Sequence, residues 1–282
     1  AAKQDKERVA MVDFEEAKDK VYMGLERKSK VISEEDKKTT AYHEAGHALV
    51  ARFLPFTDAV NKVTIIPRGR AAGVTWFLPE ERDFKYKDQL QSELSVAYGG
   101  RVAEELIFNR ISTGAAGDIK QATDLAERMV RSWGMSDLGP LSYAKGEEHI
   151  FIGREIAQHR DFSEETARRI DDEIAKLINN AYTRAHSMLK DNVDILHRLA
   201  EVLLEKETVL GDELDQLILE LRPGFDFPSK HESAASQEPE TEAQSRASSE
   251  TPSAEAEKAP DAADETPSPD DDGSQDSESD KE

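Results

Sequence analysis

The sequence predicts a mainly helical protein with a small β-sheet or hairpin and a disordered acidic C-terminal tail. Three observations support this fold class. After residue 88, apolar residues recur every three or four positions, which is typical of amphipathic helices. Two short β-rich runs, at residues 63–66 and 74–78, are each closed by a proline. The last 54 residues contain no Val, Ile, Leu, Met, Phe, Trp or Tyr.

The helices are predicted from this spacing together with their start and stop signals. A short helix covers residues 14–21, where Asp13 and Glu16 form a capping box. A second helix begins near Ser33 and is ended by Pro55. Five further helices follow, at residues 88–108, 118–133, 163–189, 192–206 and 211–221.

Composition divides the chain into three predicted parts. Residues 229–282 hold 17 acidic and 4 basic side chains, so they carry −13 of the net charge of −22 and leave −9 for residues 1–228. Such a polar segment cannot bury enough apolar surface to offset the entropy of ordering, so we expect a disordered tail, either simply solvated or used for docking. Residues 31–228 are the predicted main domain. The highly charged residues 1–30 contain one short helix and are expected to end a preceding domain.

Composition and charge also exclude several classes of protein. No run of about 18 apolar residues exists, which excludes a membrane-spanning helix within these residues. The absence of cysteine excludes disulfide scaffolds, thiolate metal sites and cysteine nucleophiles. An acidic domain argues against nucleic acid as a partner, because neutralising phosphates needs a basic surface. The chain begins at Ala1 without a signal peptide pattern, so we expect it to be the C-terminal piece of a longer protein.

One motif in the predicted second helix carries chemistry. Residues 43–47, His-Glu-Ala-Gly-His, have the form H-E-x-x-H, which places both imidazoles on one helix face. Two imidazoles and one oxygen ligand suit zinc and leave a fourth position for water. Glu44 lies beside His43, where it can take a proton from that water and pass it to a leaving amine. The alternative is a helix with two ordinary histidines. Gly46 favours the metal site, because it costs about 1 kcal/mol relative to Ala unless something approaches the helix closely.

Spacing alone leaves the third ligand of such a site open. The acidic candidates on later helices are Glu104, Glu105 and Asp118. Asp118 is equally compatible with a plain helix N-cap. Val50 and Phe53 stand where a metzincin has glycine and histidine, which excludes that class. The remaining histidines show no paired spacing: His149, His159, His186, His197 and His231.

Several blocks of the sequence resemble the FtsH family of ATP-dependent, membrane-anchored zinc proteases. They occur in the family's order and cover about residues 10–220, so together they are far more specific than H-E-x-x-H alone. The blocks are residues 40–48 (TAYHEAGHA), 62–69 (KVTIIPRG), 73–75 (GVT), 98–105 (YGGRVAEE), 112–115 (STGA) and 133–136 (WGMS).

The resemblance implies a specific set of site residues. It assigns zinc to His43, His47 and Asp118, and it makes Glu44 the general base. Glu104 matches a family glutamate that is also considered a ligand. We keep Glu104 as the second choice and expect it to support a ligand through a hydrogen bond.

The resemblance also implies what surrounds this part of the protein. It predicts protein substrates, a homo-hexamer and a preceding AAA+ ATPase module, with residues 1–30 at the end of that module's lid. No G-x-x-x-x-G-K-[ST] loop occurs in the chain, so ATP dependence would belong to the longer protein. The longer protein is expected at the cytoplasmic face of the bacterial inner membrane, anchored by its N-terminal part. The 282 residues themselves are expected to be soluble.

The function expected on these grounds is zinc-dependent hydrolysis of peptide bonds in unfolded or membrane-extracted proteins, through a zinc-bound water activated by Glu44. The alternative is a non-catalytic module with a structural metal that holds a ring together. Glu44 favours the enzyme, since a structural site gains nothing from a base beside its ligand. The run at residues 63–66 has two open interpretations, a substrate-binding sheet edge or a strand of a small core.

Overall fold

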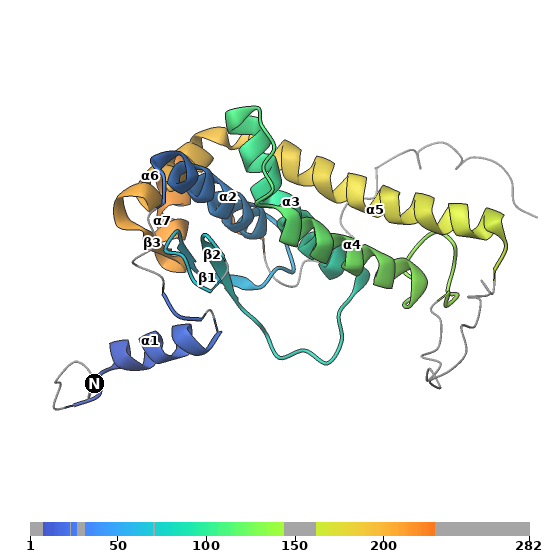
Figure 1. Cartoon of the computed structure of the whole chain (residues 1–282), viewed down its shortest axis with the longest axis horizontal. Coiled ribbons are helices and arrows are strands. Elements are labelled where there is room, and N and C mark those ends of the chain that lie inside the picture. The colour runs from blue at the N-terminus through green and yellow to red at the C-terminus, as the bar shows by residue number, and fades with distance from the viewer. Residues whose placement is uncertain (1–7, 23, 27–31, 70, 144–161, 229–282) are drawn as a thin grey trace, which may run out of the picture. The chain divides into compact units, whose positions relative to one another are not determined.

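A computed structural model describes residues 8–22, 24–26, 32–69, 71–143 and 162–228 of the chain. These residues form seven helices and one three-stranded sheet, so the prediction of a mainly helical fold with a small sheet is confirmed (Figure 1). Two sets of predictions lie outside the described residues. They are the acidic tail at residues 229–282, and His149, His159 and His231.

Three helices form the centre of the helical part. α2 (Glu34–Phe53) packs against α3 (Lys87–Phe108), and α3 packs against α5 (Glu164–Asp191). Three shorter helices complete it: α4 (Ala116–Arg131), α6 (Val193–Lys206) and α7 (Gly211–Leu221). Large apolar side chains that are completely buried fill the space between these helices, among them Leu49, Leu94, Ile170, Leu196 and Ile218. No helix among the described residues combines the length and apolarity needed to cross a bilayer.

The close contact between α2 and α3 depends on two glycines. A Cβ on Gly46 would lie 2.3 Å from the carbonyl oxygen of Gly99, and a Cβ on Gly99 would lie 2.6 Å from the carbonyl oxygen of Gly46. The two backbones therefore touch where the glycines meet. Ala103, which is completely buried, continues this small-residue contact, because its Cβ would lie 2.8 Å from a Cβ on Gly46. Gly46 thus has the role that the sequence suggested, since α3 approaches α2 at the H-E-x-x-H motif.

Two helices begin earlier than predicted. α1 runs from Met11 to Tyr22, so Asp13 lies in the first turn and accepts a hydrogen bond of 2.8 Å from the backbone N–H of Ala10. Asp13 therefore belongs to the helix, and its carboxylate binds the backbone N–H of the residue before the helix. It does not act as the N-cap of a helix at residues 14–21. α4 likewise begins at Ala116, which places Asp118 in its first turn and excludes the plain N-cap interpretation.

The sheet has the strand order β2-β1-β3, with both pairs antiparallel. β1 covers Ala59–Thr64, β2 covers Val74–Leu78 and β3 covers Thr208–Leu210. The hairpin of β1 and β2 was predicted, but β3 was not, because three residues between two helices carry no alternation signal. In Figure 1 the strands lie beside α2 and α7, which both contact β1.

The order of the strands corrects one prediction. Val63 of β1 pairs with Thr75 of β2 on one side and with Val209 of β3 on the other, so β1 is the central strand. The backbone N–H of Ile65 continues the pairing by donating to the carbonyl of Glu207. The interpretation of residues 63–66 as a free sheet edge is therefore wrong. Within the described part of the chain, the two outer strands, β2 and β3, each have a free edge.

Candidate metal centre

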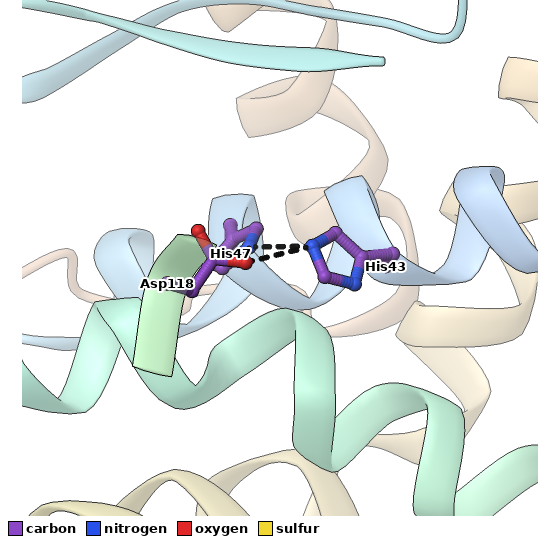
Figure 2. A group of neighbouring side chains, drawn as sticks. All are labelled: His43, His47 and Asp118. Atoms are coloured by element: carbon purple, nitrogen blue, oxygen red, sulfur yellow. Dashed lines mark hydrogen bonds and ion pairs between the residues drawn. The ribbon is translucent and has the colours of Figure 1, made fainter. Parts of the chain in front are cut away.

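Three predicted site residues converge between α2 and the first turn of α4. The Nε2 atoms of His43 and His47 lie 3.0 Å apart (Figure 2). Oδ2 of Asp118 lies 3.3 Å from Nε2 of His43 and 3.7 Å from Nε2 of His47. The helix places the two imidazoles one turn apart on a single face, and α4 brings the carboxylate to them from 71 residues along the chain. This is the one such cluster of potential metal-binding groups found among the described residues.

The other nitrogen of each imidazole is held from α3. Nδ1 of His47 lies 2.7 Å from the backbone carbonyl oxygen of Val96, and Nδ1 of His43 lies 2.7 Å from Oε1 of Glu104. A carbonyl and a carboxylate only accept, so each Nδ1–H donates, and each ring in its neutral form presents a lone pair at Nε2. Both lone pairs therefore point into the cluster. Glu104 lies on the side of His43 opposite to Asp118.

The spacing of these three atoms fits a metal ion. In a tetrahedral site with ligand distances of about 2.0–2.1 Å, ligand atoms lie about 3.3 Å from one another. The observed separations of 3.0, 3.3 and 3.7 Å bracket that value. Two lone pairs and a carboxylate oxygen repel each other unless a cation or a proton lies between them. Two imidazoles and one carboxylate are a donor set that zinc accepts, with one position left open.

Without a metal the same cluster binds a proton strongly. Burial lowers the pKa of His43, but hydrogen bonds to Asp118 and Glu104 and the charge of Glu44 outweigh it and raise this pKa to about 10. Burial raises the pKa of Asp118, yet hydrogen bonds from His43 and His47 hold it well below its usual range. Asp118 is therefore ionised at neutral pH, and a metal ion has to displace the proton of His43.

The carboxylate of Glu104 is held by the same contacts. Burial raises its pKa, but hydrogen bonds from His43 and Ser112 outweigh burial and lower it. Its side chain is only 3% exposed, whereas that of Asp118 is 30% exposed. Glu104 thus lies where a carboxylate supports His43 through a hydrogen bond, as the sequence suggested. Glu105 points elsewhere and accepts a hydrogen bond of 2.6 Å from the hydroxyl of Tyr182.

Glu44 lies beside the cluster and is almost completely buried. Its Oε2 accepts a hydrogen bond of 2.7 Å from the hydroxyl of Thr75 on β2, and the same hydroxyl lies 3.1 Å from the Glu44 backbone carbonyl. Burial raises the pKa of Glu44, while the charges of His47 and His43 and the Thr75 hydrogen bond oppose this. A carboxylate with a raised pKa is better suited to accept a proton at neutral pH.

The cluster and Glu44 line a common cavity of about 960 Å³. Val74, Thr75 and Phe77 of β2 form part of its wall, so this edge strand of the sheet borders the candidate centre. Among the described histidines outside the motif, His197 bonds to Tyr42 and His186 packs on Tyr182, and neither joins the cluster.

Sequence reasoning missed two contributors to this site. Thr75 belongs to the block at residues 73–75, but its role has no local signal, because it depends on the position of β2 beside α2. Gly100 had a visible signal in the Gly99-Gly100 pair of the predicted helix. A Cβ at Gly100 would lie 2.5 Å from Cε1 of His43, so glycine makes room for that imidazole.

A mainly helical domain with an H-E-x-x-H helix, a converging aspartate and a buried glutamate defines the class of a candidate metallopeptidase. Comparison with known families supports this class. The model of peptidase family M41 matches residues 30–217, and the chain belongs to this family. The matched residues include all four side chains of the candidate centre: His43, Glu44, His47 and Asp118.

Named relatives confirm the resemblance to the FtsH family. The chain is 55% identical over 220 residues to the "ATP-dependent zinc metalloprotease FtsH" of Magnetococcus marinus, covering 77% of the chain and 33% of that relative. It is 51% identical over 229 residues to the protein of the same name in Acidobacterium capsulatum, covering 81% and 35%. "ATP-dependent zinc metalloprotease FtsH 4" of Sorangium cellulosum is 55% identical over 222 residues, covering 77% and 34%. The chain thus spans about a third of the length of these relatives.

Proposed function

We propose that residues 31–228 form a zinc endopeptidase domain that hydrolyses peptide bonds of unfolded or membrane-extracted proteins. His43, His47 and Asp118 would hold the zinc ion, and Glu44 would act as general base. The observation that carries this proposal is the convergence of three metal-binding groups beside a buried glutamate in one cavity. The family and the names of the relatives support it.

The ligands are proposed to bind zinc through the atoms that already converge. His43 and His47 would use Nε2, and Asp118 would use Oδ2. A bound zinc ion supplies a Lewis acid that polarises a carbonyl and lowers the pKa of water. Glu104 and the carbonyl of Val96 keep the two imidazoles in the required tautomer and orientation.

Glu44 is proposed to move the proton. It would accept a proton from the attacking water and then deliver it to the leaving amine, which are the two proton transfers that peptide hydrolysis requires. Thr75 holds Oε2 of the carboxylate, so proton exchange falls to the other oxygen. The walls of α2 and β2 around Glu44 exclude bulk water from this carboxylate, which keeps its pKa raised.

The free edge of β2 is proposed to bind the substrate, in place of residues 63–66. An extended peptide can add to a sheet edge through backbone hydrogen bonds, which do not depend on its sequence. β2 pairs with β1 on one side, and among the described residues no strand covers its other side. Because Val74, Thr75 and Phe77 line the cavity, a peptide on this edge would pass the metal centre.

The longer protein is proposed to work as the relatives' names indicate, with ATP-dependent proteolysis. Nucleotide binding would then belong to the part of those relatives that the chain does not cover. We propose that the assembly is a homo-hexamer attached to the membrane through a preceding segment, with the peptidase on the cytoplasmic side. These features follow from the family resemblance and are separate from the chemistry of the centre.

The direct test of the peptidase activity is hydrolysis of an unfolded protein by the purified chain, before and after metal removal. Cleavage should disappear on treatment with a chelator and return when one equivalent of zinc per chain is restored. Restoration of the zinc content without any cleavage would favour the alternative, a non-catalytic module with a structural metal.

A further inference from the structure

The segment before the metal-binding helix is fastened to the outer face of the sheet by a buried ion pair. Asp19 of α1 is only 7% exposed, and its carboxylate oxygens lie 2.6 and 2.8 Å from Nζ of Lys62 on β1. The guanidinium of Arg68 lies 3.6 Å from the same carboxylate. A carboxylate buried beside two cations is a specific attachment, because removing its charge leaves the ammonium group of Lys62 without its carboxylate partner.

Trp76 on β2 is a second point of attachment. The ring of Tyr22, at the end of α1, stacks on Trp76 with centroids 5.6 Å apart and an angle of 30° between the planes. The ammonium groups of Lys18 and Lys62 lie 4.7 and 5.6 Å from the centroid of the Trp76 ring. Stacking and cation–π contacts of this kind stabilise the position of an aromatic ring.

A third attachment holds the turn between β1 and β2. The backbone N–H of Gly69 donates to the carbonyl of Leu25 at 3.4 Å, and Arg68 forms a β-bridge with Glu26. The guanidinium of Arg68 also forms an ion pair with Glu26. Residues 11–22 and 24–26 therefore contact β1, the turn and β2.

β2 links these contacts to the candidate base. Side chains alternate along a strand, so Trp76 faces α1 while Thr75 and Phe77 face the cavity. Thr75 in turn holds the carboxylate of Glu44 at 2.7 Å. Among the described residues, β2 has a neighbouring strand on one edge only, so its position depends on what packs against its outer face. Because Thr75 is the residue next to Trp76, a movement of Trp76 caused by α1 would also move Thr75.

We propose that residues 11–22 and 24–26 position Glu44 from outside the cavity, through Trp76 and Thr75. The proposal rests on the proposed function of Glu44 as general base. Docked against Trp76, α1 keeps β2 in place and the Thr75 hydroxyl on the carboxylate. When α1 is undocked, β2 can shift, so kcat falls while the metal ligands stay in position. Thr75 and Trp76 are then positioning residues, and a movement of the preceding segment can control hydrolysis without a contact to the metal.

The test is a double-mutant cycle in the full chain, with zinc content, kcat and KM as readouts. Asp19→Asn combined with Tyr22→Ala releases α1, and Thr75→Val removes the hydrogen bond to Glu44. Each should lower kcat about 10- to 100-fold, the range for groups that orient a catalytic residue, with one zinc per chain and KM nearly unchanged. Because both changes act through the same hydrogen bond, combining them should lower kcat no further than Thr75→Val alone.

Control variants separate this route from a general loss of structure. Phe14→Ala alters an exposed side chain of the same helix and should leave kcat unchanged. Thr75→Ser keeps the hydroxyl and Tyr22→Phe keeps the stacked ring, so both conservative variants should have the kcat of the unaltered chain. In a Trp133→Phe background, release of α1 should shift the fluorescence of Trp76 to longer wavelength, as expected for a newly exposed indole.

Three results from the kinetic and zinc measurements would overturn the proposal. The first is an unchanged kcat on release of α1, and the second is a fall in kcat that follows loss of zinc. The third is that release of α1 and Thr75→Val lower kcat independently, so that their effects multiply when they are combined. An unchanged Trp76 fluorescence would show that α1 is not docked there, which also contradicts it. If release of α1 has no effect while Glu44→Gln is inactive, the positioning role fails and the proposed function stands. If Glu44→Gln remains active, the proposed function fails as well.

Discussion

Nδ1 of His43 donates a hydrogen bond of 2.7 Å to Oε1 of Glu104, a residue 61 positions further along the chain. This contact separates the roles of two carboxylates that the sequence alone could not distinguish. Glu104 lies beside Nδ1 of the imidazole, and Asp118 lies on the opposite side, beside Nε2. A metal ion between the imidazoles would therefore contact Asp118, and Glu104 would act on it through His43.

The two carboxylates should respond differently to loss of charge. Asp118→Asn should weaken zinc binding by several powers of ten with the fold intact, because it removes one of three ligands. Glu104→Gln should weaken it only about 10- to 100-fold, the usual effect of a group that orients a ligand. A competition titration with a chromogenic zinc chelator measures both values. The reverse order of effects would make Glu104 the ligand.

A methyl group on Gly100 should damage the site through His43. The added Cβ would lie 2.5 Å from Cε1 and 2.6 Å from both nitrogens of the ring, so the imidazole has to leave its position between Glu104 and Asp118. Gly100→Ala should therefore lower zinc affinity at least 10-fold. Gly117→Ala is the matched control, since a Cβ there meets no atom within 4 Å, although Asp118 is its neighbour. Equal zinc affinities of the two variants would show that the ring tolerates displacement.

Zinc affinity should increase with pH. The pKa of His43 is raised to about 10 in the metal-free protein, so this ring carries a proton at neutral pH that zinc has to displace. Lower pH strengthens the competing proton, and one displaced proton corresponds to about a tenfold change in apparent affinity per pH unit. Titrations between pH 6 and pH 8 measure this slope. An apparent affinity independent of pH would show that no proton is released.

Removal of residues 229–282 should leave both stability and hydrolysis nearly unchanged. These residues have no large apolar side chain with which to pack on the rest of the chain, and their acidic groups repel one another. Thermal unfolding of the shortened chain, with hydrolysis of an unfolded substrate as the second readout, tests this expectation. A melting temperature lower by several degrees would show that the tail docks.

The predictable part of the structure is what local sequence determines. Ser33 and Pro55 bracket α2 closely, because an N-cap hydroxyl and a proline act within one turn of a helix. The position of the two histidines on one face follows directly from helix geometry. The third ligand could not be predicted in this way. Spacing left Asp118, Glu104 and Glu105 as equal candidates, and only the family resemblance selected Asp118.

What could not be predicted depends on contacts between distant segments. β3 consists of three residues whose pairing with β1 turns that strand from an edge into the centre of the sheet. The hydrogen bond from Thr75 to Glu44 exists because β2 lies beside α2, which no periodicity indicates. The contacts of Asp19 and Tyr22 with the sheet are likewise invisible in a short charged helix. Each of these contacts depends on tertiary packing between residues that lie dozens of positions apart in the sequence.

Comparison of Glu44→Gln with the unaltered chain tests the central claim most directly, because glutamine preserves the shape of the side chain and removes its ability to accept a proton. Glu105→Gln serves as control, since that carboxylate bonds to Tyr182 away from the metal-binding cluster. With one zinc bound per chain in all three proteins, Glu44→Gln should hydrolyse an unfolded protein about 10²- to 10⁴-fold more slowly, and Glu105→Gln should retain its activity. Hydrolysis by zinc-loaded Glu44→Gln at the rate of the unaltered chain would contradict the assignment of Glu44 as the base.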